Sequence, residues 1–212
     1  MNADANASPE LPLKLRPRLE SELALGWPHV RIAGVDEAGR GPLVGDVVAA
    51  AVILPGPADW LDQLNDSKKL SAKKREELAL KLLDQAHVGV GSCTPAEIDQ
   101  LNILWASMLA MERAISALPV VPQHCLIDGN RLPKGLDIPA TAIVRGDARS
   151  QSIAAASIIA KVERDQRMYE LAEQYPGYGF ERNKGYPTAQ HRSALDRLGP
   201  TPHHRKSFKL GG

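Results

Sequence analysis

Apolar residues follow two patterns along the chain after Arg31: short continuous runs of strand length, and longer segments in which they recur at helical spacing. The short runs predict strands over 31–37, 46–54, 87–93, 124–128 and 138–144. The helical spacing predicts helices over 71–83, 94–118, 150–175 and 188–198. Strands interleaved with helices in this order indicate one α/β (α+β) domain, with a central mixed five-stranded sheet flanked by helices and a helical C-terminal part.

Two segments are apolar on nearly all sides, which predicts that they are buried. The run over 46–54 fits a strand in the middle of the sheet, and the first half of 150–175 fits a helix packed against the sheet. Ser71 is suited to cap the helix that follows it, and Thr94 with Glu97 forms a capping box. Core positions are expected at Trp105, Met108 and Met111, which recur at helical spacing.

The first thirty residues differ from the rest of the chain. They are rich in Asn, Ala, Ser and Pro at the start, so we expect residues 1–30 to be a partly disordered tail that ends in a docking segment around Leu23–Trp27. Residues 31–212 are then a single domain. A secretory signal and an apolar run of membrane-spanning length are both lacking, and only two cysteines occur, so a cytoplasmic, soluble protein is expected.

Acidic residues lie at the ends of three predicted strands. Asp36 and Glu37 end the first, Asp128 ends the fourth, and Asp147 follows the fifth. Acids at the ends of neighbouring strands can converge at one edge of a sheet, where their mutual repulsion favours a divalent cation. Oxygen ligands without His or Cys select Mg²⁺ or Mn²⁺ over Zn²⁺. Turn formation also favours an acid before glycine, so spacing alone leaves a metal site and simple turns as alternatives.

Asp36 and Glu37 pose a geometric problem because adjacent residues of a regular strand point to opposite faces of the sheet. Both can reach one metal site only if the strand has begun to turn, which Ala38 and Gly39 permit. From the residues alone, Asp36 is therefore the better-supported ligand.

Six sequence blocks, in order and with intact spacing, resemble the ribonuclease HII family. The first is GVDEAGRGPLVGDVVAAAVIL at Gly34–Leu54, and it is followed by NDSKKLSAKKRE, LIDGN, RGDARSQSIAAASIIAKVERD, GYPT and HRKSF. The resemblance spans about Arg31 to Phe208. It implies an RNase H-like fold and an endoribonuclease that hydrolyses the RNA strand of RNA–DNA hybrids and nicks duplex DNA 5′ of embedded ribonucleotides, leaving 3′-hydroxyl and 5′-phosphate ends.

The resemblance also implies roles for individual residues. Two divalent cations, Mg²⁺ or Mn²⁺, would be held by the four acids Asp36, Glu37, Asp128 and Asp147. The ribonucleotide 2′-hydroxyl would be read by the loop Gly39, Arg40 and Gly41, in which glycines let the backbone approach the sugar. Tyr186 matches the residue that stacks on the next sugar, and Ser67 and Lys68 match a phosphate-contacting segment.

Two positions depart from the family pattern: Asp46, where a small residue or proline is usual, and Asn183, where histidine is common. We expect Asp46 to face away from the site. The formal net charge is only +1, yet Ser67–Arg75 contains five cations and no acid, which favours phosphate contacts. His191, His203 and His204 lack metal-ligand spacing and are expected at the surface or near phosphates, and Asp165 is expected to cap the helix or pair with Lys161 or Arg167.

The expected partner is an RNA–DNA hybrid or a DNA duplex with embedded ribonucleotides, acted on by a monomer. Two alternatives remain. One is a module that binds hybrids without cutting, which the intact set of acids disfavours. The other is a different RNase H-like metal-dependent nuclease, for which the Gly39–Gly41 loop and Tyr186 would have no purpose.

Overall fold

The structure, a computed structural model, describes residues 17–210. Its single sheet has five strands: β1 (Ile32–Ala38), β2 (Val47–Ile53), β3 (His87–Cys93), β4 (His124–Asp128) and β5 (Ala140–Ile143). The strand order is β3-β2-β1-β4-β5. β2 pairs antiparallel with β1 and β3, whereas β4 pairs parallel with β1 and β5. The predicted mixed five-stranded sheet is confirmed.

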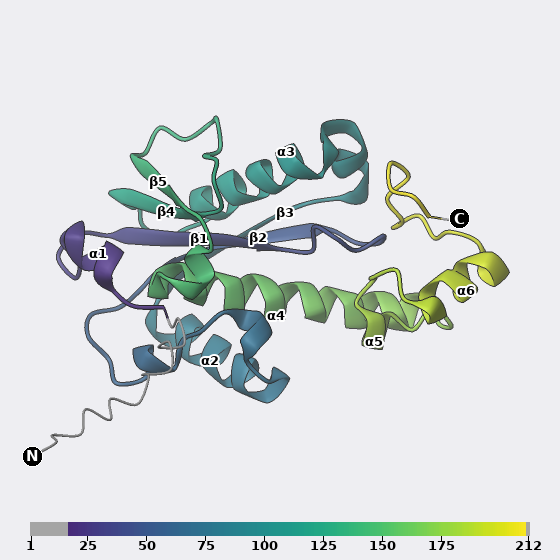
Figure 1. The fold of residues 1–212 in the computed structure, drawn as a ribbon, viewed down its shortest axis with the longest axis horizontal. Coiled ribbons are helices and arrows are strands. Elements are labelled where there is room, and N and C mark those ends of the chain that lie inside the picture. Colours follow the sequence, from purple (N-terminus) through teal and green to yellow (C-terminus); the bar gives the residue numbers. More distant parts are fainter. Residues whose placement is uncertain (1–16, 211–212) are drawn as a thin grey trace, which may run out of the picture.

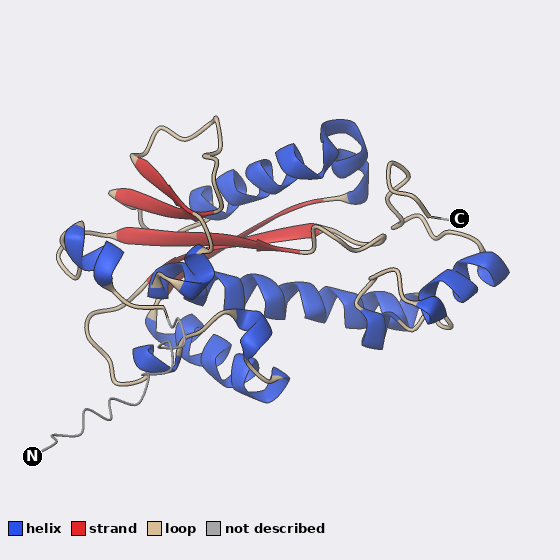
Figure 2. Ribbon diagram, viewed as in Figure 1, coloured by secondary structure: helices blue, strands red, loops and turns tan. Residues whose placement is uncertain are grey.

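Helices cover both faces of this sheet (Figures 1 and 2). One face carries α3 (Pro95–Ser116), and the other carries α4 (Gln151–Gln174) with α2 (Ala72–Gln85) outside it. α4 extends beyond the sheet to α5 (Phe180–Asn183) and α6 (Ala189–Leu198), while the short α1 (Glu20–Ala24) lies at the opposite end. Within residues 17–210, no helix combines the length and the apolar character that crossing a membrane requires.

The core has two main layers separated by the sheet. Even-numbered β1 residues such as Ile32 face α4, and odd-numbered ones such as Val35 face α3. Every residue of β2 is buried, as predicted for a strand in the interior of the sheet. β1 and α4 touch through Gly34, where a Cβ atom would lie 2.0 Å from the carbonyl carbon of Ser152. Only glycine permits this separation between the two backbones.

Two predicted helix starts are confirmed. The Ser71 hydroxyl accepts from the Lys74 N–H (3.2 Å), and Thr94 and Glu97 form the complete capping box. α3 also contains a kink that the sequence pattern does not show. Asn102 has a φ of 65°, and its side chain accepts from the N–H of Leu104, so it restarts the helix after the break.

The N-terminal segment docks beside the start of α4. Trp27 is buried within the predicted docking segment, and the Glu22 carboxylate, just before it, accepts from the Ser152 N–H (2.9 Å) and from the hydroxyls of Ser150 and Ser152. Arg18 forms an isolated parallel bridge with Ser150. Packed structure therefore reaches further toward the N-terminus than Arg31, because Glu22 caps α4. The rest of the predicted tail, residues 1–16, lies outside the described residues.

Candidate active site

The predicted acids meet at one edge of the sheet because β1 and β4 are parallel neighbours. Asp36 and Glu37 lie near the end of β1, and Asp128 ends β4. Asp147 follows β5 in a short 3₁₀ turn, Gly146–Ala148. A carboxylate oxygen of Asp128 accepts from the Gly146 N–H at 2.6 Å, which ties this turn to β4. The expectation that the strand-end acids converge is thus met by the topology.

β1 does not turn at Glu37. It stays paired with β2 as far as Ala38, which lies opposite Val48. Asp36 and Glu37 nevertheless border the same cleft, since the chain turns at Gly39, where φ is +99°. The Arg40 guanidinium donates to Glu37 Oε1 at 3.2 Å, and the Glu37 N–H donates to Asp36 Oδ1 at 2.7 Å.

The acids perturb one another. Burial raises the pKa of Asp36 well above its usual value, and the negative charges of Glu37 and Asp128 raise it further. Burial also raises the pKa of Glu37, although Arg40 opposes this shift. The pKa of Asp147 is raised by burial and then by the nearby charges of Asp66 and Asp128. Negative charge is therefore concentrated in a poorly solvated place, which disfavours ionisation unless a cation is bound.

A cleft of about 320 Å³ joins most of the predicted site residues. Its lining includes Asp36, Glu37, Gly39, Arg40, Gly41, Ser67, Lys68 and Tyr186. Asp128 and Asp147 are not part of this lining but interact electrostatically with Asp36. Lys161 and Arg164, which were not predicted as site residues, also line the cleft. Their spacing of three residues, directly after the apolar first half of α4, was the available signal.

The Gly39–Gly41 loop lies directly against Tyr186. A Cβ atom on Gly41 would come within 3.3 Å of Tyr186 Cε1, and the Tyr186 side chain is 44% exposed. The Leu43 N–H donates to the Gly185 carbonyl at 2.8 Å, which fixes the loop relative to the segment that carries the tyrosine. The two elements expected to contact sugars therefore share one wall of the cleft.

Ser67 and Lys68 reach the cleft from a 3₁₀ turn, Ser67–Lys69, before α2. The Ser67 N–H donates to the Ser157 hydroxyl on α4 at 3.3 Å, which anchors the turn. Burial alone lowers the pKa of Lys68, but the carboxylates of Asp66 and of the site acids outweigh burial and raise it. Lys68 is therefore a firmly protonated cation beside the acids.

The donor set is chemically suited to a hard divalent cation. All four side chains offer carboxylate oxygens, and no histidine or cysteine lines the cleft. Among residues 17–210, however, no group of three or more such side chains is already arranged to hold an ion. The residues fit Mg²⁺ or Mn²⁺ by their chemistry and by the repulsion that a cation would relieve.

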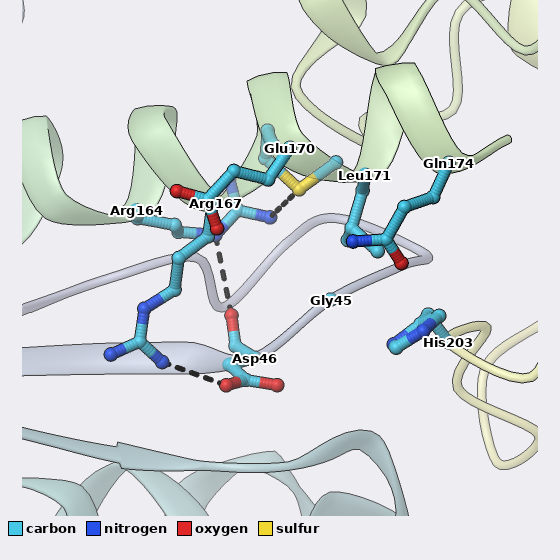
Figure 3. A pocket seen from close by; sticks show the side chains of 9 residues that line it. Gly45, Asp46, Arg164, Arg167, Glu170, Leu171, Gln174 and His203 are labelled. Atoms are coloured by element: carbon cyan, nitrogen blue, oxygen red, sulfur yellow. Dashed lines mark hydrogen bonds and ion pairs between the residues drawn. The ribbon is translucent and has the colours of Figure 1, made fainter. Parts of the chain in front are cut away.

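Asp46 points away from the cleft, as expected. Its carboxylate pairs with Arg167 at 2.8 Å in a second cavity of about 220 Å³ that Arg164, Gln174 and His203 also line (Figure 3). Asn183, the other departure from the family pattern, is buried and shapes the turn before Tyr186. Its side chain donates to the Tyr178 carbonyl and accepts from the Gly185 N–H, both at 2.8 Å.

Two of the three histidines expected at the surface or near phosphates are buried, so the surface position is wrong for them. His191 and His204 are 0% and 2% exposed, and their Nε2 atoms lie 3.1 Å apart. The Thr201 N–H donates to His204 Nδ1, so His204 carries its proton on Nε2 and donates to His191, which donates through Nδ1 to the Tyr186 carbonyl. Both rings are neutral in this chain of hydrogen bonds. Asp165 pairs with Lys161 at 2.6 Å, one of the two partners expected.

This histidine pair predicts acid sensitivity. Burial, and then the neighbouring His191, lowers the pKa of His204 to about 4. Unfolded histidine takes up a proton near pH 6.5, so the contribution to stability is complete above that pH and is lost as the pH falls toward 4. We expect a loss of roughly 3 kcal/mol in the free energy of unfolding across this window. Urea unfolding at a series of pH values measures it.

The acids with raised pKa values change the stability in the opposite direction as the pH falls, but they do so equally in wild type and in His204→Asn. The difference between the two curves is therefore the contribution of His204. Replacement of the exposed His29 by asparagine is the matched control and should leave the curve unchanged. A wild-type curve parallel to that of His204→Asn between pH 6.5 and 4 would contradict the neutral pair.

Comparison with known proteins agrees with this geometry. The family model described as "Ribonuclease HII" matches residues 33–211. A protein named ribonuclease HII from Ruegeria pomeroyi is 59% identical over 192 residues, covering 91% of this chain and 81% of its own length. The crystal structure of ribonuclease H2 from Pyrococcus horikoshii OT3 superposes with a TM-score of 0.69 at 28% identity, covering 85% of this chain and 94% of that one.

The fold alone is shared with Bst-RNase HIII, solved in complex with Mn²⁺, at a TM-score of 0.62 and 16% identity over 88% of this chain and 70% of that one. Family match, sequence identity and fold coincide over the part of the chain that carries the acids, the Gly39–Gly41 loop and Tyr186. The chain therefore belongs to the ribonuclease HII family, metal-dependent ribonuclease H-type hydrolases that act on RNA–DNA hybrids.

Proposed function

We propose that this protein nicks duplex DNA on the 5′ side of an embedded ribonucleotide, as well as cutting the RNA strand of hybrids, and leaves 3′-hydroxyl and 5′-phosphate ends. The observation that carries this proposal is the shared cleft, in which Asp36 and Glu37 lie beside Gly39–Gly41 and Tyr186. A nuclease that does not distinguish ribose from deoxyribose would need the acids, but it would not need the Gly39–Gly41 loop or Tyr186. Residues 31–212 would act as one catalytic domain, with residues 18–30 docked against it.

The carboxylates would hold two divalent cations, Mg²⁺ or Mn²⁺, and such ions supply an activated water and stabilise the leaving 3′-oxygen. Asp36 is the best placed to bridge them, because it is the most buried of the four acids and is influenced by the other three. Glu37, Asp128 and Asp147 would complete the binding set. Since no three acids within residues 17–210 are arranged around one point, metal binding would include reorientation of at least one carboxylate.

Cations on the cleft wall would bind and orient the substrate strand. Lys68, Lys161 and Arg40 all line the cleft, and each can contact a phosphate without reading its base. Arg40 pairs with Glu37 at 3.2 Å, so the loop that would read the sugar is linked directly to a carboxylate that would bind metal. Recognition of the ribose and placement of the scissile phosphate would in this way be coupled.

The wall formed by Gly41 and Tyr186 would test the sugars on either side of the cut. Gly41 would leave the loop backbone open to a 2′-hydroxyl, because it carries no Cβ; a Cβ there would lie 3.3 Å from Tyr186 Cε1. Tyr186 would stack on the following deoxyribose, where an additional hydroxyl would clash. The 2′-hydroxyl of the sugar is the group that distinguishes a ribonucleotide from a deoxyribonucleotide at the cut.

The test uses a labelled DNA duplex with one ribonucleotide, the same duplex made entirely of DNA, and Mg²⁺, Mn²⁺ or EDTA. We expect a single nick 5′ of the ribonucleotide, only with metal and only in the first duplex. Binding without cutting would instead indicate a binding module, and cutting of both duplexes would indicate a nuclease that does not read ribose.

A further inference from the structure

Arg205 is completely buried, yet its guanidinium contacts no carboxylate among residues 17–210. It donates instead to four backbone carbonyls of one loop: Gly39 at 2.6 Å, Arg40 at 3.0 Å, Pro42 at 2.8 Å and Gly45 at 2.9 Å. Burial of a charge without an ionic partner is costly, and hydrogen bonds to several carbonyls offset much of that cost. The loop over 39–45 is therefore wrapped around one side chain.

These contacts determine where the loop's N–H groups point. In a trans peptide the C=O of one residue and the N–H of the next point in opposite directions, and the loop has no cis peptide. Since the carbonyls of Gly39 and Arg40 point toward Arg205, the N–H groups of Arg40 and Gly41 point away from it. Both residues are exposed and line the cleft, and neither N–H has a hydrogen-bond partner within the described part of the chain.

Arg205 is itself held firmly. Its N–H donates to the Leu43 carbonyl at 2.9 Å, and the preceding residue, His204, forms an antiparallel bridge with Val44. The next two residues, Lys206 and Ser207, donate through their N–H groups to the Asp99 carboxylate on α3 at 3.0 and 2.8 Å. The guanidinium is thus a fixed support rather than a mobile side chain.

We infer that Arg205 is a positioning residue for ribose recognition: it holds the Gly39 and Arg40 carbonyls so that the N–H groups of Arg40 and Gly41 are presented in the cleft as donors to a 2′-oxygen. This inference rests on the proposed function. The planar guanidinium reaches four carbonyls in different directions, which the single ammonium of lysine cannot do. Arg205 does not contact the reacting atoms, and its effect passes entirely through the loop.

The experiment compares Arg205→Lys with Ser207→Ala, which removes a hydroxyl contact with Asp99 in the same segment but none with the loop. Each protein is assayed at least 15 °C below its own Tm. Cleavage is measured as kcat and KM on the duplex with one ribonucleotide. Binding to that duplex and to the all-DNA duplex is measured with Asp36→Asn added, so that cleavage does not interfere.

Arg205→Lys should reduce the binding preference for the ribonucleotide-containing duplex at least about tenfold, the equivalent of one good hydrogen bond. Affinity for the all-DNA duplex should stay within about twofold, because the phosphate contacts are unchanged. Ser207→Ala should keep the wild-type preference. A general structural defect would weaken binding to both duplexes equally, and that result would overturn the inference.

Arg205→Gln provides a second variant should the lysine variant unfold, because its amide can donate to two of the four carbonyls without a charge; the same loss of preference is expected. An unchanged preference in a folded variant would refute the positioning role. Failure of the proposed function gives a different result, in which the wild-type protein itself shows no preference for the ribonucleotide.

Discussion

Replacing Asp36 with asparagine is expected to lower the rate of cleavage at least about 10³-fold while leaving duplex binding intact. Asparagine has the same shape and can still accept the N–H of Glu37, but it lacks the negative charge with which Asp36 would bind metal. The cations on the cleft wall, which would contact phosphates, are untouched. Single-turnover cleavage and equilibrium binding of the duplex with one ribonucleotide measure the two effects separately.

The same substitution should raise the melting temperature by about 2–5 °C in the absence of metal. Asp36 has a raised pKa because burial and its acidic neighbours disfavour the charged form, so an ionised Asp36 destabilises the folded protein at neutral pH. Asp84→Asn, at an exposed carboxylate on α2, is the matched control and should change neither rate nor melting temperature. A near wild-type rate for Asp36→Asn would refute the two-metal scheme.

The largest effect on stability is expected from Gly34→Ala. The new Cβ would lie 2.0 Å from the Ser152 carbonyl carbon and 2.3 Å from the Ile153 nitrogen, and both are backbone atoms that cannot rotate away. β1 and α4 would have to separate, which should lower the free energy of unfolding by at least about 3 kcal/mol. Chemical denaturation of purified protein measures this loss.

Gly56→Ala is the matched control, because a Cβ there meets no atom within 4 Å and Gly56 lies outside the sheet. Its stability should stay within about 0.5 kcal/mol of wild type. Gly34→Ala should also reduce activity in whatever protein remains folded, since Asp36 lies two residues further on the same face of β1. Wild-type stability in Gly34→Ala would mean that β1 and α4 are less tightly packed than the structure indicates.

Much of the fold could be predicted because its elements have strong local patterns. The uninterrupted run now seen as β2 and the capping box of Thr94 and Glu97 are each recognisable within ten residues. The convergence of Asp36 and Asp128 followed from their places at strand ends, given parallel pairing. The kink at Asn102 could not be predicted, because its backbone conformation (φ 65°, ψ 163°) is rare for a residue other than glycine and the helical spacing continues across it.

The residues that support the site could not be predicted from the sequence, for a different reason. Arg164 donates to backbone carbonyls at Asp46 and Val44, which are 118 and 120 positions away. Every residue has a backbone carbonyl, so the residue types do not show which one is the partner. The burial of His191 and His204 likewise depends on a partner thirteen residues distant and on aromatic neighbours from another segment. Local spacing shows which side chains can do chemistry, but not which of them hold a backbone in place.

The parallel pairing of β1 with β4 has a consequence for how activity is acquired during folding. Ile32 lies opposite His124, so the paired residues are 92 positions apart in the chain (124 − 32), and every acid but Glu37 depends on that pairing to meet Asp36. Contacts of such long range carry a large loop-closure cost and form late relative to helices and the β1–β2 hairpin. A partly folded chain can therefore hold the β1–β2 hairpin without a complete set of acids, and before Arg205 supports the Gly39–Gly41 loop. Nuclease activity in this protein is a property of the finished domain and not of any fragment that folds earlier.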